Sequence, residues 1–297
     1  YTEVGASVHE CRVQYSKDSS APTWLAGLDY NITDDLLLYG KYSRGYRQGS
    51  VQPFSVPGQT TYDPEQVDAY ELGFKSSFDA AIRGTFNMAL FYNELDDQQL
   101  LYGFGSSTNR APGNAAIVNA GSARVYGAEV DAMMVLFRGL HVNLSYAYLD
   151  TEVLELDAIT PNPATGYDVS LPLSVAGDPL PYSTKHKASA SASYTLPLDA
   201  KVGEVSAIAT YAYQSELYIS SSSRFGAVPS YGLLNLNLNW NQMFGSGFDA
   251  ALFVTNVSDK EYRSAITNSW GSFGFEAEIS GEPRMYGVRL RYRFGGE

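Results

Sequence analysis

Between residues 234 and 241 the chain alternates strictly between an apolar and an amide side chain, reading Leu-Asn-Leu-Asn-Leu-Asn-Trp-Asn. Successive side chains of a β-strand point to opposite faces of the sheet, so this segment would have one apolar and one polar face. Because the two kinds of residue are separated so completely, the segment is predicted to be a strand that lies between an apolar environment and water.

The same two-residue period returns along the chain, at residues 86–93, 142–148, 188–194 and 286–294. Aromatic residues often stand at the ends of the apolar faces, where a transmembrane barrel has its interfacial girdles of Tyr and Trp. Composition agrees, because 23 Tyr and 27 Gly against 3 His favour pleated sheet over helical core. We therefore expect strands to dominate. No apolar run approaches the roughly 20 residues that a membrane-spanning helix needs.

The connections between the predicted strands alternate in length. Short turns are expected near residues 32–35, 78–82, 137–141, 198–202 and 243–247, and long connections near 47–63, 101–117, 151–182, 220–229 and 258–282. Short periplasmic turns on one rim and long extracellular loops on the other are typical of outer-membrane barrels. The expected fold class is therefore all-β, an antiparallel transmembrane β-barrel with about 11 strands from residue 21 onward and a weaker twelfth within residues 1–15.

Charge and motifs exclude several classes of function. The net charge of -12 argues against nucleic acid as a partner, since phosphate binding depends on clustered Lys and Arg. Enzyme motifs such as Gly-x-Ser-x-Gly, the phosphate-binding loop and His-Glu-x-x-His are missing, and His9, His141 and His186 are scattered. Cys11 is the single cysteine, so neither a disulfide framework nor a Cys-rich metal site can form within the chain. The acidic loop 150–178 lacks the spacing of an EF-hand. Neither catalysis, nor a cofactor, nor a metal site is expected.

Five segments in order resemble the C-terminal half of TonB-dependent receptors. They are LLLYGKYSRGYRQG at 36–49, PEQVDAYELGFK at 64–75, NAGSARVYGAEVD at 119–131, LFVTNVSDKEYR at 252–263 and PRMYGVRLRYRF at 283–294. Each also has a physical interpretation. Pro64 opens a strand at the membrane rim, Gly73 and Gly127 relieve crowding in the barrel wall, and Asn256 with Asp259 suits a turn.

The resemblance implies a barrel of about 22 strands whose lumen holds an N-terminal plug. Residues 1–297 are then the C-terminal half of the barrel, and several hundred further residues are expected upstream, including the plug and its energy-coupling segment. The expected location is the bacterial outer membrane. The expected partners are outer-membrane lipid, the TonB complex acting through the missing plug, and a small-molecule or iron-chelate ligand.

Three sets of site residues are predicted. The first is basic and expected to face the lumen, where it pairs with plug carboxylates or contacts the ligand: Lys41, Arg44, Lys75, Arg289, Arg291 and Arg293. The second consists of loop aromatics that either stack on a ligand or hold the loops together: Tyr102, Phe104, Trp270, Phe273 and Phe275. The third resembles the C-terminal assembly signal of outer-membrane proteins: Tyr286, Gly287, Leu290, Tyr292 and Phe294. This last motif departs from the usual pattern at Met285 and in the three residues that follow Phe294.

The main functional hypothesis is energised uptake of a scarce solute such as a ferric siderophore, cobalamin or an oligosaccharide. One alternative is a self-contained barrel of about 12 strands, acting as a passive channel or as a hydrolase, although no Ser and His stand at a recognisable spacing. Another is a secreted β-sandwich adhesin or lectin. Residues 109–112 resemble part of a haem-receptor motif, but no nearby His can ligate iron.

Overall fold

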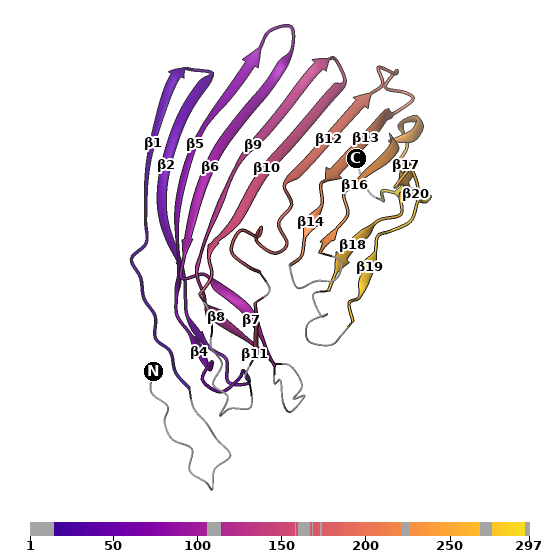
Figure 1. Ribbon diagram of the computed structural model, residues 1–297. Coiled ribbons are helices and arrows are strands. Elements are labelled where there is room, and N and C mark those ends of the chain that lie inside the picture. Colours follow the sequence, from indigo (N-terminus) through magenta and orange to yellow (C-terminus); the bar gives the residue numbers. More distant parts are fainter. Residues whose placement is uncertain are drawn as a thin grey trace.

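The computed structural model describes residues 15–105, 114–157, 159, 167, 169–172, 174–220, 226–267 and 275–294. One eleven-stranded sheet dominates it (Figure 1), and every strand is antiparallel to its neighbours. The order follows the chain: β1 (Trp24–Thr33), β2 (Leu36–Arg47), β5 (Glu65–Asp79), β6 (Arg83–Asp96), β9 (Ser122–Phe137), β10 (Leu140–Glu155), β12 (His186–Thr195), β13 (Glu204–Gln214), β16 (Tyr231–Asn241), β17 (Phe248–Thr255) and β20 (Met285–Tyr292). The predicted strands are confirmed.

The two rims of the sheet differ as predicted. Short turns join the strands at the top of Figure 1, and long connections at the bottom carry small hairpins of their own. One turn includes the 3-10 helix η2 (Met243–Gly245). The short strands of the loops are β3 (Ser50–Val51), β4 (Thr61–Tyr62), β7 (Gln99–Gly105), β8 (Asn114–Asn119), β11 (Val169–Pro172), β14 (Leu217–Tyr218), β15 (Ala227–Val228), β18 (Arg263–Ile266) and β19 (Glu278–Ser280). Within the described ranges, no helix is long and apolar enough to cross a membrane.

The sheet is open at both sides in the part of the chain that the structure describes. There β1 pairs with β2 alone and β20 pairs with β17 alone. The possible twelfth strand falls on residues 1–14, which lie outside the described residues. The sheet therefore keeps two strand edges available for further neighbours.

A row of tyrosines marks one border of the apolar face. The register aligns Tyr42, Tyr70, Tyr92 and Tyr126 side by side across β2, β5, β6 and β9. The next row toward the long loops is charged and contains Arg44, Asp68, Glu94, Arg124 and Glu152. Aromatic rings prefer the membrane interface and charges avoid hydrocarbon, so the membrane border runs between these two rows.

A second aromatic group lies at the opposite end of the apolar face, near the short turns. Ring centroids are 5.8 Å apart in the pair Phe137 and Tyr194, and 4.5 Å apart in the pair Phe248 and Tyr292. The two groups together bound an apolar band, as predicted from the aromatic residues at strand ends.

Glycines in the family-like segments allow neighbouring strands to carry aromatic rings over them. A Cβ atom at Gly73 would stand 2.6 Å from both the carbonyl oxygen of Met88 and the hydroxyl of Tyr39. A Cβ atom at Gly127 would overlap the carbonyl oxygen of Tyr148. Real side chains do not tolerate such approaches, which confirms the prediction that these glycines relieve crowding.

The turn predicted around Asn256 is also confirmed. Asn256 has a φ of 49° and Asp259 a φ of 53°, the left-handed conformation that Asn and Asp tolerate best. The Asn256 amide nitrogen donates to the carbonyls of Lys260 at 2.9 Å and Glu282 at 3.1 Å. This side chain therefore closes the chain where β17 ends.

The long loops pack into two lobes with separate apolar cores. The first lobe contains β3, β4, β7, β8 and β11, and its buried core is Val56, Tyr102, Phe104, Ala116, Val118 and Ala120. The second lobe contains β14, β15, β18 and β19, and its buried core is Ile219, Val228 and Ile266. Burial of apolar side chains is what stabilises a loop that lacks the support of the main sheet.

Candidate functional site

Lys41 and Lys75, two of the basic residues predicted to face the lumen, lie on the polar face of the sheet. Lys41 Nζ lies 2.6 Å from Glu71 Oε2, and the hydroxyl of Tyr39 donates to Glu71 Oε1 at 2.8 Å. Lys75 stands on the same face of β5 as Glu71, with its Nζ 5.7 Å from the centroid of the Tyr39 ring. Lys41 and Lys75 thus share one face, and the wall itself supplies the carboxylate that pairs with Lys41.

Arg44 does not share that face, and its predicted lumenal position is wrong. Arg44 stands three positions after Lys41 in an unbroken strand. Because successive side chains alternate between the two faces, the two side chains point to opposite sides. Arg44 Nε donates to Asp68 Oδ1 at 2.7 Å, and its guanidinium lies 5.1 Å from the centroid of the Trp24 ring. It belongs to the charged row beyond the tyrosines, where β2 has left the apolar band.

Arg289 and Arg291 of β20, and Arg293 directly after its end, share the polar face with the asparagines of β16. Arg293 is held by Asp249, whose Oδ2 accepts from Nη2 at 2.7 Å and from Nε at 3.0 Å. Arg291 lies opposite Asp249 in the register and Arg289 lies opposite Ala251. One wall carboxylate therefore stands beside a basic strand. Pairing of Arg289 and Arg291 with a plug stays a prediction.

The residues of the predicted assembly signal lie on an exposed edge strand. Tyr286, Leu290 and Tyr292 alternate on the apolar face, and Phe294 packs edge-on to Tyr292 at 4.6 Å between ring centroids. A Cβ at Gly287 would come within 2.6 Å of the Phe253 ring, so Gly287 makes room for that ring. Their role in membrane assembly stays a prediction.

Two of the predicted ligand-contacting aromatics form the core of the first lobe instead. Tyr102 and Phe104 are each only 2% exposed, so of the two roles predicted for them, stacking on a solute is excluded in this conformation and holding the loops together is the one they have. Burial, together with the nearby Asp157 carboxylate, raises the pKa of Tyr102 to about 12. Phe275 is 58% exposed, while Trp270 and Phe273 lie outside the described residues.

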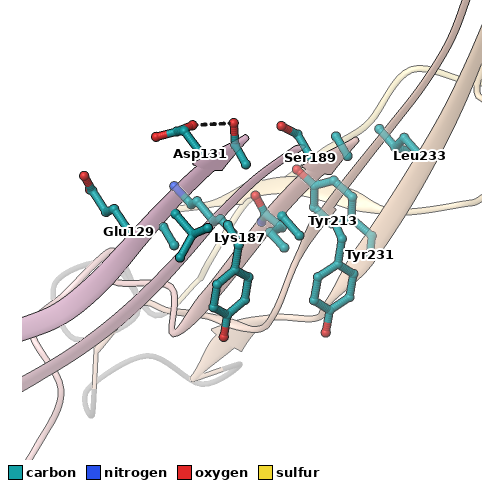
Figure 2. A pocket seen from close by; sticks show the side chains of 14 residues that line it. Glu129, Asp131, Lys187, Ser189, Tyr213, Tyr231 and Leu233 are labelled. Atoms are coloured by element: carbon teal, nitrogen blue, oxygen red, sulfur yellow. Dashed lines mark hydrogen bonds between the residues drawn. The ribbon is translucent and has the colours of Figure 1, made fainter. Parts of the chain in front are cut away.

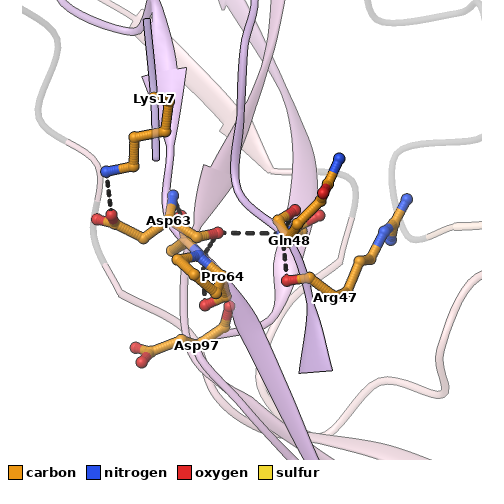
Figure 3. A network of polar contacts seen from close by, with 8 residues as sticks. Lys17, Arg47, Gln48, Asp63, Pro64 and Asp97 are labelled. Carbon is orange, nitrogen blue, oxygen red and sulfur yellow. Dashed lines mark hydrogen bonds and ion pairs between the residues drawn. The ribbon is translucent and has the colours of Figure 1, made fainter. Parts of the chain in front are cut away.

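Two amide side chains join the base of the first lobe to the connections at the ends of the main strands, and Figure 3 shows Gln48, Asp63 and Asp97, whose backbone groups they bind. Asn119 accepts from the Asp63 amide at 2.6 Å and donates to the carbonyls of Asp63 and Asp97, both at 2.8 Å. Gln99 donates to the carbonyls of Gln48 and Asp63, both at 3.0 Å. We call Asn119 and Gln99 the amide clasp, because together they tie two loops to one base.

The first lobe presents one aromatic side chain that was not predicted as a site. Phe54 is 94% exposed, although Val56, two residues on, is buried in the lobe core. Its backbone is fixed, since the Asn114 amide donates to the Phe54 carbonyl at 3.2 Å and Ser55 donates to Gln52 at 3.1 Å. The sequence predicted a long connection at 47–63, but not which of its apolar residues would be buried.

A hollow lies on the polar face of the sheet and spans β9, β10, β12, β13 and β16 (Figure 2). It has a volume of about 590 Å³. Glu129, Asp131, Lys187 and Ser189 rise from the same side of the sheet, and Ser145 donates to Asp131 Oδ1 at 2.7 Å. Within the described part of the chain, no group of three or more His, Cys, Asp or Glu side chains is placed to hold a metal ion. The side chains that line the hollow offer hydrogen bonds and charge.

Comparison with known proteins identifies the family. The family model "TonB dependent receptor-like, beta-barrel" matches residues 2–257, and the chain belongs to this family of outer-membrane barrels. It is 24% identical over 272 residues to the ferrichrome outer membrane transporter/phage receptor of Escherichia coli (strain K12), covering 89% of this chain and 32% of that protein. It is 26% identical over 285 residues to the ferric-pyoverdine M114 receptor PbuA of Pseudomonas sp. (strain M114), covering 94% and 30%.

A solved structure shares the fold. The ferric yersiniabactin uptake receptor FyuA from Yersinia pestis superposes with a TM-score of 0.68 at 20% identity, covering 92% of this chain and 37% of that one. The chain spans about a third of the length of the curated relatives it matches. These relatives are transporters and receptors rather than enzymes, and the location is the bacterial outer membrane.

Proposed function

We propose that this chain forms the C-terminal half of the barrel of a receptor that takes up a ferric chelate in a TonB-dependent manner. The observation that carries the proposal is a polar sheet face with a hollow, next to two folded lobes on the long-loop rim, in a chain of a family whose relatives are named for ferric chelates. The lobes would capture the chelate and the wall would line its way to the periplasm. A plug in an upstream part of the protein would couple entry to TonB.

The two open edges favour this receptor over a small passive channel. Unpaired backbone groups in hydrocarbon are unfavourable by several kcal/mol each, so strands β1 and β20 both need neighbours in the membrane. Further strands of a larger barrel would supply them. The plug would fill the lumen of such a larger barrel, so a solute would pass only when the plug moves.

The test is uptake of radiolabelled iron by cells that carry the intact receptor, with a receptor-deleted strain as control. Ferrichrome and ferric pyoverdine serve as probes, each in the presence and in the absence of TonB. Accumulation that needs both the receptor and TonB is the expected result. Entry without TonB, or ion conductance by the isolated 297 residues, would point to the passive channel. A failure of every ferric chelate, with cobalamin or an oligosaccharide entering instead, would overturn the iron assignment.

A further inference from the structure

The hollow of Figure 2 brings together polar side chains that neighbouring residues leave available. The register places Glu129, Lys187, Gln214 and Tyr231 in one row, with Ala147 between the first two. The next row contains Asp131, Ser145 and Ser189. Both rows lie on the polar face, so carboxylate, ammonium, amide, phenol and hydroxyl groups all open into one space.

The charged groups of the hollow differ in pairing from Lys41 and Arg293 on the same face of the sheet. Lys41 is paired with Glu71, and Arg293 with Asp249. By contrast, among the residues that the structure describes, neither Glu129 nor Asp131 nor Lys187 has an oppositely charged partner within 4.0 Å. Asp131 accepts a hydrogen bond from Ser145, but charged groups that are held by a sheet and lack an ion-pair partner are suited to a polar ligand.

The charge of the hollow is negative. Two carboxylates against one ammonium leave a single net negative charge, in a chain whose own net charge is -12. Its volume of about 590 Å³ lies within the range of roughly 300–1,000 Å³ that is usual for small-molecule sites. The basic strand β20, with Arg289 and Arg291, contributes no residue to the lining. A solute in the hollow would therefore meet an acidic wall.

We propose that this hollow is a lumenal subsite that selects uncharged or cationic ferric chelates rich in hydroxyl or amide groups and disfavours anionic ones. The inference rests on the proposed receptor function and narrows its substrate class. Glu129 and Asp131 accept hydrogen bonds from the chelate and repel negative charge. Lys187 and Gln214 donate hydrogen bonds, and the Tyr231 ring, which lies 4.4 Å from the Tyr262 ring between centroids, offers an apolar surface.

The experiment measures the affinity of the intact, detergent-solubilised receptor for two probes, uncharged ferrichrome and anionic ferric citrate. Wild type is expected to bind ferrichrome more tightly. The double variant Glu129→Gln/Asp131→Asn should bind ferric citrate roughly two- to tenfold more tightly than wild type, the range of partly screened charge contacts. Lys187→Gln should shift the preference in the opposite direction, which keeps the test decisive where the double variant fails to fold.

Asp29→Asn is the matched control. Asp29 is a residue of β1 that pairs with Tyr39 of β2, and it lies on the polar face of the sheet but outside the hollow. Its neutralisation should therefore leave both affinities unchanged. Equal effects of Asp29→Asn and the double variant, or an unchanged preference in the folded double variant, would overturn the subsite while leaving the receptor function in place. The receptor function fails on the uptake assay instead, when the intact protein takes up none of the ferric chelates or takes them up without TonB.

Discussion

The first half of the sheet is taller than the second. The edge strand β1 has 10 residues, but the strands that follow it, β2, β5, β6, β9 and β10, have 12, 15, 14, 16 and 16, whereas β12, β13, β16, β17 and β20 have 10, 11, 11, 8 and 8. A tilted strand needs about 9–11 residues to cross a bilayer. The first half therefore continues past the membrane by several residues per strand, while the second half ends at or near its surface.

This difference explains where charge can stand on the outer side of the sheet. In the taller half, Arg44, Asp68, Arg124 and Glu152 lie beyond the tyrosine row and form ion pairs in water. The extended strands also give the first lobe a base to which the amide clasp attaches it. The shorter half carries a lobe with a smaller core and has the arginines of β20 at its edge. The longer strands thus form a base for the first lobe, whereas the shorter strands form a lower wall.

The largest effect is expected where the taller half packs most closely. A side chain at Gly127 would overlap the Tyr148 carbonyl, so Gly127→Val should destabilise the barrel by about 3 kcal/mol or more and reduce the folded protein in the membrane. The measurement is the fraction of intact receptor that resists unfolding in detergent on heating. Gly105→Ala is the control, because its Cβ would meet nothing within 4 Å. Equal resistance of the two variants would contradict the close packing described for β9 and β10.

A second prediction compares the two lobes directly. Phe104→Ala removes a buried ring from the larger core and should destabilise the first lobe by about 3–5 kcal/mol. Val228→Ala in the smaller core should destabilise the second lobe by about 1–2 kcal/mol. Hydrogen exchange of the loop amides, read separately for each lobe, measures both. Increased exchange in both lobes of the Phe104 variant would show that they are one cooperative unit rather than two.

Sequence reasoning succeeded where a short-range period determines the structure. Alternation in segments such as 234–241 fixed which residues face the apolar band, and turn lengths fixed which rim carries the loops. Arg44 was misplaced because it was grouped with Lys41 by charge, although an odd separation sets them on opposite faces. The sequence could not decide between the two roles predicted for Tyr102 and Phe104, because their burial depends on contacts with Val56 and Val118, which are distant in sequence and leave no local signal.

The third prediction tests the amide clasp. Asn119→Ala leaves the backbone groups of Asp63 and Asp97 without their partner. The base of the first lobe should therefore be destabilised by about 1–3 kcal/mol. Limited proteolysis should then cut the connections at 48–64 and 97–121 faster, while the thermal resistance of the barrel stays unchanged. Asn237→Ala in β16, within the shorter half of the sheet, is the matched control. Rapid cutting in the control as well would mean that the loss of any asparagine loosens the sheet.

The smallest effect is one of pH and vanishes near neutrality. Because burial raises the pKa of Tyr102 from its ordinary 10 to about 12, the folded lobe favours the protonated phenol. Its contribution to stability is complete below pH 10 and is lost as the pH rises through about 12. The phenolate absorbance of wild type minus that of Tyr102→Phe should therefore show a single tyrosine that titrates near 12. A difference spectrum centred near 10 would mean that water reaches this hydroxyl and that the core of the first lobe is open to solvent.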